Sequence, residues 1–319
     1  MSKTAFIFPG QGSQQVGMGK EFYDSFTVAK ETFEEVDEAL KQNLSKIIFE
    51  GSQEDLTLTE NTQPALMVTS IAILRVLLNQ SGKDITDFCN YVAGHSLGEY
   101  TALCAAGTFT LEETAKLLKI RGQAMQQAVP QGKGAMAAII GLSFEDIKEI
   151  ADNVSSSGEV CEIANDNSVG QIVISGSAQA IDLAEEKAKE KGAKRYVKLP
   201  VSAPFHCSLM KPAQERMAEA LNETIFKDPR LPVIANVTAE KTSQTSEIKK
   251  HLIDQVTARV RWRETVINMA SNYEVSNAVE IGEGKVLSGL VKKTEKSIAT
   301  QNISKPAQMD ECLEKLLAA

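Results

Sequence analysis

The sequence predicts an α/β protein in which a small subdomain interrupts a larger one. A short apolar strand opens the chain, and a strand–turn–helix pattern follows around residue 96. Six short elements in the order βαββαβ then lie between residues 130 and 199, which is the order of a ferredoxin-like module. We therefore expect a small ferredoxin-like subdomain at 130–199 and a large α/β subdomain at 1–129 and 200–319.

The first 129 residues are predicted to alternate strands and helices. The apolar segment TAFIF stops at Pro9-Gly10, a typical end for a buried strand. The run PALMVTSIAILRVLL is apolar nearly all round, so the helix that contains it should be buried. We expect strands at 4–8 and 91–93 and helices at 20–40, 62–80 and 98–106.

The elements that follow are shorter. Ser143, with Asp146 three residues later, indicates the start of a helix, and Gly192 indicates the end of another. We expect strands at 134–141, 159–165, 170–176 and 193–201, with helices at 143–155 and 177–192. After this module we expect a helix near 211–225 and strands near 232–236 and 278–281.

Composition narrows the class of protein. A net charge of -8 argues against nucleic acid or an anionic membrane as a partner. The five cysteines are scattered, without a C-x-x-C pair, which favours reduced thiols over a metal knuckle or a redox couple. The N-terminal apolar run is too short for a signal peptide, and no apolar stretch of about 18 residues follows. We expect a soluble cytoplasmic protein with no metal or cofactor.

The segment AGHSLGEY contains the pattern Gly94-x-Ser96-x-Gly98. In this pattern a sharp turn between a strand and a helix presents a serine hydroxyl, and the predicted elements on either side fit that context. Ser96 is therefore a candidate nucleophile, which needs a base because a free hydroxyl is a poor nucleophile at neutral pH.

Only three histidines can serve as that base. The side chain of His95 should diverge from that of its neighbour Ser96, so we expect it to pack or hydrogen-bond beneath the turn. His251 lies in a polar helical run and is expected on a solvated face. His206 lies in the rigid, mostly apolar segment LPVSAPFHCSLM, so we assign it as the base, with a core histidine as the alternative. No single Asp or Glu is indicated as its orienting partner.

A tetrahedral oxyanion needs two N–H donors, and one should come from Leu97, which follows the nucleophile. The glycine-rich loop FPGQGSQ is a candidate for the other, since its spacing fits neither a P-loop nor a dinucleotide fingerprint. Arg121 ends an apolar helical stripe. It is either a surface residue or a bidentate ligand for a carboxylate on the acyl group.

Six segments together, FPGQGSQ, TQPAL, GHSLGEY, RG at 121–122, NDNSVGQ and VSAPFH, resemble the bacterial malonyl-CoA:acyl carrier protein transacylases of type II fatty acid synthesis. The resemblance runs from end to end. It implies an α/β-hydrolase-like large subdomain with an inserted ferredoxin-like small one. Two departures are Glu283, where the family often has proline, and Cys207, where serine is common. Phe205 is similar to the residue of malonyl-selecting relatives.

The resemblance also implies the chemistry. Malonyl-CoA would acylate Ser96 with His206 as general acid/base, and the malonyl group would pass to the phosphopantetheine thiol of acyl carrier protein in a ping-pong cycle that supplies fatty acid synthesis. The remaining roles would be oxyanion donation by the backbone of Gln11 and Leu97, binding of the malonyl carboxylate by Arg121, and orientation of His206 by the main-chain carbonyl of Gln255.

Two other classes of function stay open from the residues alone, a serine esterase or thioesterase and a non-catalytic module that docks a carrier protein. Carrier proteins of this pathway are acidic, so docking needs a local basic face. Candidates are Lys191, Lys194, Arg195 and Lys198 in one group and Lys285, Lys292 and Lys293 in another. Whether Gln63 and Asn165 contact substrate or only shape the cleft also stays open.

Overall fold

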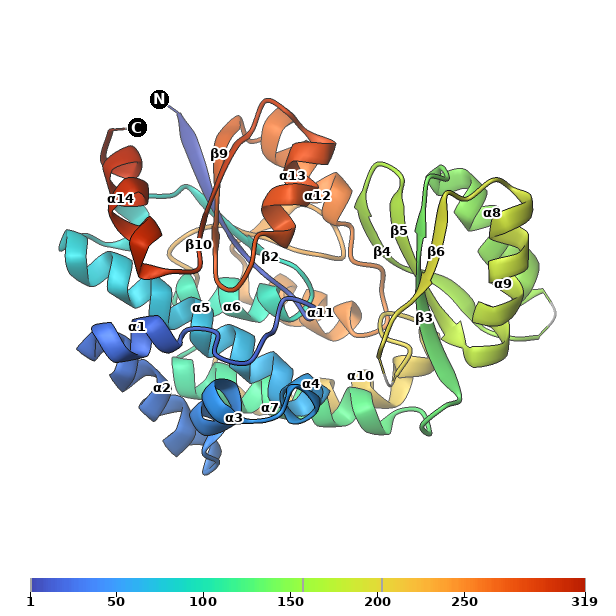
Figure 1. Cartoon of the computed structure of the whole chain (residues 1–319), viewed down its shortest axis with the longest axis horizontal. Helices are drawn as coiled ribbons and strands as arrows, with labels where there is room; N and C mark the ends of the chain where they lie inside the picture. The colour runs from blue at the N-terminus through green and yellow to red at the C-terminus, as the bar shows by residue number, and fades with distance from the viewer. Residues whose placement is uncertain (1, 157, 202, 319) are drawn as a thin grey trace.

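The computed structural model describes residues 2–156, 158–201 and 203–318, in two subdomains that lie side by side (Figure 1). Met1, Ser157, Ser202 and Ala319 lie outside the described residues, Ser202 being part of the VSAPFH segment. The green and yellow of the small subdomain fall between the blue–cyan and orange–red of the large one, so the small subdomain is inserted in the chain.

The large subdomain is built on a six-stranded sheet in the order β10-β9-β1-β2-β7-β8. All neighbours pair in parallel except β8, which is antiparallel to β7. The strands are β1 (Lys3–Phe8), β2 (Tyr91–Gly94), β7 (Val233–Ile234), β8 (Lys241–Thr242), β9 (Val275–Ile281) and β10 (Ala299–Ile303).

Helices cover both faces of this sheet, which explains why β1 is apolar without alternation. Phe6 and Phe8 of β1 pack in one core with α5, whereas Ala5 and Ile7 pack in a second core with Trp262. The helices of the large subdomain are α1 (Lys20–Ser25), α2 (Thr27–Leu40), α3 (Leu44–Glu50), α4 (Gln53–Thr57), α5 (Thr59–Ser81), α6 (Leu97–Ala105), α7 (Leu111–Gln127), α10 (Lys211–Glu223), α11 (Thr245–Gln255), α12 (Trp262–Ser271), α13 (Val286–Thr294) and α14 (Met309–Ala318).

The small subdomain has the predicted βαββαβ order. Its antiparallel sheet has the order β4-β5-β3-β6, and α8 and α9 pack against it around a separate core. The Ser143 side chain accepts the N–H of Asp146 at the start of α8, as the sequence indicates. The elements are β3 (Gly134–Ile140), α8 (Phe144–Ser155), β4 (Cys161–Ser168), β5 (Gln171–Ser177), α9 (Ala178–Glu190) and β6 (Arg195–Lys198).

Main-chain hydrogen bonds join the two subdomains. The N–H of Asp166 in β4 donates to the oxygen of Val260 at 2.9 Å, and the N–H of Val260 donates to Ala164 at 2.8 Å. The buried carboxylate of Asp166 also accepts three N–H···O contacts of 2.8–3.0 Å from the Arg263 guanidinium. These contacts fix β4 against the segment that follows α11.

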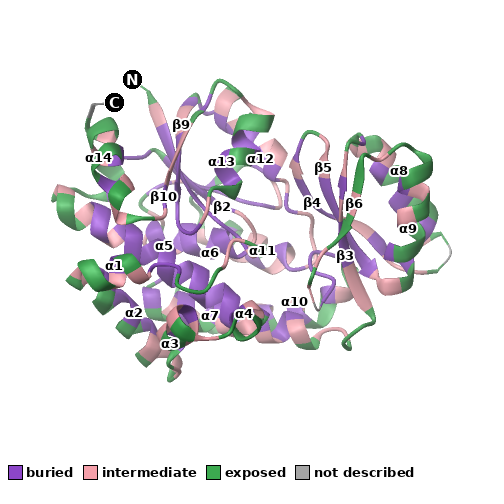
Figure 2. Cartoon of the chain, in the orientation of Figure 1, coloured by how far each residue is buried: buried purple, intermediate pink, exposed green. Residues whose placement is uncertain are grey.

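Several predicted elements have different bounds in the structure. The helix expected at 20–40 is broken at Phe26, which is extended, so α1 and α2 are separate. The last strand of the small subdomain and β7 are shorter than expected. The expectation that no stretch of about 18 residues is apolar enough to span a membrane is wrong, because helix α5 is long and apolar enough. However, 89% of its most apolar stretch is buried inside the protein, as expected for the predicted core helix (Figure 2).

Candidate active site

Ser96 occupies the tight turn between β2 and α6. Its backbone has φ 55 and ψ -113, a conformation that residues with a side chain rarely adopt. The flanking glycines make this turn fit. A Cβ at Gly94 would lie 1.9 Å from the oxygen of Gly98, and a Cβ at Gly98 would lie 2.3 Å from the oxygen of Phe8. The G-x-S-x-G spacing thus reflects close backbone packing around the serine.

His206 lies beside Ser96, with 2.8 Å between its Nε2 and the serine Oγ. On its other side, Nδ1 is 2.9 Å from the main-chain oxygen of Gln255. Since a carbonyl can only accept, Nδ1 carries the proton, and the Nε2 lone pair faces the hydroxyl. This carbonyl is the partner that the family resemblance implies; the residues alone indicate none. It takes the place of the carboxylate that orients the histidine in many serine enzymes.

The imidazole of His206 is buried next to a positive charge. Burial, together with the charge of Arg121, lowers the pKa of His206 to about 3. The ring is therefore neutral near pH 7 and can accept the proton of Ser96.

Arg121 is buried, with 1% exposure, so its interpretation as a surface residue is wrong. Its Nη1 donates to Oε1 of Gln63 at 2.8 Å, and its Nη2 donates to Oε1 of Gln255 at 2.9 Å and to the Ser96 Oγ at 3.2 Å. These direct partners are neutral. The buried carboxylate of Glu99, whose charge also acts on Arg121, contacts the Gln255 amide and not the guanidinium, and a buried cation without a direct carboxylate contact is costly. Gly122 allows the approach of α7 to α5, because a Cβ there would lie 2.6 Å from the Cα of Glu60.

The catalytic candidates line a cavity of about 90 Å³. The lining includes Gln11, Gln63, Ser96, Arg121, Asn165 and His206. Gln63 and Asn165 thus reach the cavity wall, and Gln63 also holds Arg121. The volume suits a short acyl group better than a long acyl chain.

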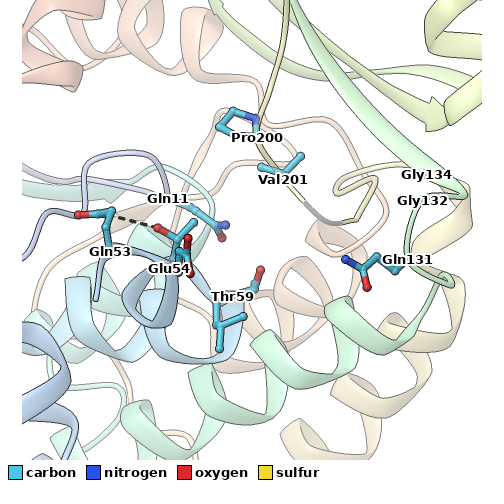
Figure 3. Close-up of a pocket in the computed structure, with 11 residues that line it drawn as sticks. Gln11, Gln53, Glu54, Thr59, Gln131, Gly132, Gly134, Pro200 and Val201 are labelled. Atoms are coloured by element: carbon cyan, nitrogen blue, oxygen red, sulfur yellow. Dashed lines mark hydrogen bonds between the residues drawn. The ribbon is translucent and has the colours of Figure 1, made fainter. Parts of the chain in front are cut away.

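A second cavity of about 570 Å³ shares Gln11 and Val201 with the first and so forms its approach. Figure 3 shows that Gln11 and Glu54 of the large subdomain line it together with Gln131, Pro200 and Val201 at the junctions of the small one. A long substrate arm can therefore lie between the subdomains while its end reaches Ser96.

The two oxyanion candidates lie at this site. Leu97 is the first residue of α6, and the N–H groups of a first helical turn have no partner within their helix. Gln11 lies in the loop after β1 and lines both cavities.

Neither of the other two histidines hydrogen-bonds to Ser96 in the part of the chain that the structure describes, although His95 also lines the acyl cavity. As expected, His95 packs and hydrogen-bonds beneath the turn, with its Nε2 2.8 Å from Oδ1 of Asn167 and its ring tilted against Trp262. His251 is half-buried on α11 and not on a fully solvated face. Within residues 2–156, 158–201 and 203–318, no group of three or more His, Cys, Asp or Glu side chains is placed to hold a metal ion.

Two residues that support the nucleophile were missed from the sequence. Oδ1 of Asn236 accepts the N–H of Ser96, and its Nδ2 donates to the oxygen of Gly94, both at 2.7 Å. Glu99, which is buried in α6, accepts the N–H of Asn236 at 3.0 Å. Glu99 lies inside the GHSLGEY segment and could have been considered, whereas nothing near Asn236 in the sequence indicates this contact.

A serine on a strand–helix turn, a neutral histidine and a buried arginine in a small cavity define an enzyme of the serine acyl-transfer class. The chain matches the acyl transferase domain family over residues 5–311 and belongs to that family. It is 48% identical over 316 residues to the malonyl CoA-acyl carrier protein transacylase of Bacillus subtilis, covering 99% of this chain and 98% of that one. The Escherichia coli K12 protein of the same name is 40% identical, with 98% and 100% covered.

Solved structures of acyltransferases have the same fold as this chain. The acyl-carrier-protein S-malonyltransferase of Bartonella henselae is 51% identical, with a TM-score of 0.95 and coverage of 98% of this chain and 99% of that one. A malonyl-transacylase solved in complex with a type II PKS acyl-carrier protein is 39% identical, with a TM-score of 0.94 and coverage of 98% and 100%. The fold is thus that of these two-subdomain acyltransferases.

Proposed function

We propose that this protein transfers the malonyl group from malonyl-CoA to the phosphopantetheine thiol of acyl carrier protein, and so supplies fatty acid synthesis. One observation carries this proposal: the guanidinium of Arg121 is buried 3.2 Å from the Ser96 Oγ in a cavity of about 90 Å³. A carboxylate on a short acyl group would provide a direct anionic contact for this cation, which Glu99 reaches only through the Gln255 amide. A simple esterase needs no such cation.

The acylation step follows from the neutral state of His206. Its Nε2 takes the proton of Ser96 while Oγ bonds to the thioester carbonyl carbon, and the backbone N–H groups of Gln11 and Leu97 would bind the oxyanion. When the tetrahedral intermediate collapses, the C–S bond breaks and His206 gives the proton to the departing sulfur of CoA. Malonyl-Ser96 remains.

The second half-reaction reverses these steps with a different thiol. His206 takes the proton of the phosphopantetheine thiol, whose sulfur bonds to the malonyl carbonyl, and then returns it to Ser96 as the C–O bond breaks. Transfer rather than hydrolysis requires that water be kept from malonyl-Ser96. The cavity is small enough for the acyl group to fill it.

The deciding experiment is mass spectrometry of the protein after mixing with malonyl-CoA. A malonyl adduct should appear on Ser96, persist in buffer, and disappear when acyl carrier protein is added. The Ser96→Ala variant should form no adduct. An adduct that water removes as fast as carrier protein does would indicate a thioesterase, and a wild-type protein without adduct would indicate a docking module.

We also propose the subdomain boundaries 1–129 with 200–319 and 130–199, and a cytoplasmic location. For docking of an acidic carrier we favour the lysines near α13, Lys285, Lys292 and Lys293. In the other candidate group, Lys191 already pairs with Glu149 at 2.9 Å and Lys198 pairs with Asp182 at 2.6 Å.

A further inference from the structure

Glu99 is a buried carboxylate behind the active site that the proposed mechanism does not use. It follows Ser96 by three residues on α6, is 2% exposed, and is not among the residues that line the acyl cavity. Burial raises the pKa of Glu99 to about 7. A buried carboxylate is costly unless its hydrogen bonds offset the cost, so the contacts of Glu99 need an explanation.

The side-chain amide of Gln255 lies between Glu99 and Arg121. Its Nε2 faces three acceptors, Oε2 of Glu99 at 2.8 Å, the main-chain oxygen of Ser96 at 3.0 Å and Oδ1 of Asn236 at 3.4 Å. Its Oε1 accepts from Nη2 of Arg121 at 2.9 Å. If the amide were reversed, its oxygen would face these acceptor oxygens and its N–H groups would face the Arg121 cation. Both contacts would be repulsive, so the surroundings fix the orientation of the amide.

Above its pKa of about 7, Glu99 is the one group among the three acceptors that carries a charge, and charge-assisted hydrogen bonds are the stronger ones, so Glu99 then contributes most to this orientation. The orientation matters for Arg121. Its guanidinium is held between two amide oxygens, Oε1 of Gln63 and Oε1 of Gln255. If the Gln255 amide loses its fixed orientation, one of these two supports is lost.

We propose that Glu99 is a positioning residue that acts through the Gln255 amide to hold Arg121 in place for a carboxylated acyl group. This inference rests on the proposed malonyl transfer. Glu99 therefore affects selectivity for the acyl group without touching it.

The test compares malonyl-CoA with acetyl-CoA as donors for acylation of Ser96 in the Glu99→Gln variant. Glutamine keeps the size and one acceptor oxygen but removes the charge. In assays at pH 8, where Glu99 is mostly ionised, we expect the malonyl-to-acetyl ratio of kcat/KM to fall about tenfold, mainly through a higher KM for malonyl-CoA. A merely structural role would lower both activities equally.

Glu280→Gln is the matched control. Glu280 is also fully buried, but it accepts the N–H groups of Leu287 and Ser288 at the start of α13. This variant should keep the wild-type acyl ratio. The Arg121→Ala background provides the second control, because Glu99→Gln should not change the ratio further when the guanidinium is absent.

The Gln255→Met variant tests the same Glu99–Gln255–Arg121 contacts by removing the amide that joins Glu99 to Arg121. It decides the question if Glu99→Gln does not fold. It removes the side-chain amide and keeps the main-chain oxygen that holds His206, so it should lower the ratio as Glu99→Gln does. An unchanged ratio in the variant that folds, or an effect of Glu99→Gln that persists without Arg121, would overturn the positioning role. A wild-type protein that forms no malonyl-Ser96 would instead overturn the proposed function.

Discussion

At the scale of single residues, the candidate site depends on two buried groups with opposite needs. His206 must stay neutral to accept a proton, whereas Arg121 must stay charged to bind a carboxylate. Their proximity serves both needs, because the charge of Arg121 helps to lower the pKa of His206. Each group therefore allows a separate test.

Replacing Arg121 by alanine should reduce malonyl transfer by about 10- to 100-fold more than acetyl transfer, since a hydrogen bond to a charged group is worth about 1.5–3 kcal/mol. Steady-state kinetics with the two CoA thioesters measure the difference. Lys119→Ala is the control, because Lys119 lies two residues away on α7 and pairs with Glu60 at 3.6 Å. Equal losses for both acyl groups in Arg121→Ala would contradict the carboxylate role.

Replacing His206 by asparagine should destabilise the protein less at pH 5 than at pH 8. The pKa of His206 falls from 6.5 to about 3 on folding, so its contribution to stability is present above pH 6.5 and is lost as the pH falls. Between pH 8 and pH 5 the wild type loses about 2 kcal/mol from this group, and the variant does not. Asparagine tolerates the positive φ of 58 at this position.

Urea unfolding of both proteins at the two pH values measures this. A stability difference between wild type and His206→Asn that is the same at pH 5 and pH 8 would show that the histidine is not held neutral.

At the scale of elements, the turn between β2 and α6 depends on how closely α6 approaches β1. Gly98 is the contact point, since a Cβ there would lie 2.3 Å from the oxygen of Phe8 and 2.9 Å from that of Pro9. Backbone atoms cannot move aside as a flexible side chain can. The loop after β1, which carries Gln11, would shift with them.

Gly98→Ala should therefore abolish most acylation of Ser96 and destabilise the protein by about 1–3 kcal/mol, the usual cost of overpacking. Gly289→Ala is the control, because Gly289 lies within α13 and an added Cβ would meet no atom within 4 Å. Alanine there should leave acylation intact and stabilise the protein by about 0.4–1 kcal/mol. Calorimetry and acylation assays of both variants check this, and full acylation in Gly98→Ala would contradict the close approach.

At the scale of the whole molecule, the cleft exists because the small subdomain is held against the large one at β4. Asp166 carries much of that contact, with its side chain fully buried and paired with Arg263. Neighbouring Asn165 lines the acyl cavity. Because Asn165 and Asp166 are adjacent in β4, a change in the contact between the subdomains should also change the shape of the acyl cavity.

Arg263→Ala should lower the free energy of unfolding by about 3–5 kcal/mol, because it leaves the buried carboxylate of Asp166 without its cation. Lys148→Ala should change it by less than about 1 kcal/mol, since the Lys148–Asp152 pair is exposed. Denaturant unfolding measures both. Similar small effects would indicate that the Asp166 contact does not hold the subdomains together.

The sequence by itself determined the βαββαβ module, the buried helix α5 and the turn at Ser96, because these depend on local periodicity, capping and backbone space. The sequence also indicated His206 as the general base, because the chain has only three histidines and the surroundings of the other two fit that role less well. Only the tertiary structure decided that Arg121 is buried, and only it revealed Asn236 and Glu99. These contacts join residues far apart in the sequence, such as Ser96 with Asn236, 140 positions away, and Glu99 with Gln255, 156 positions away, and no local pattern encodes which distant side chains will meet.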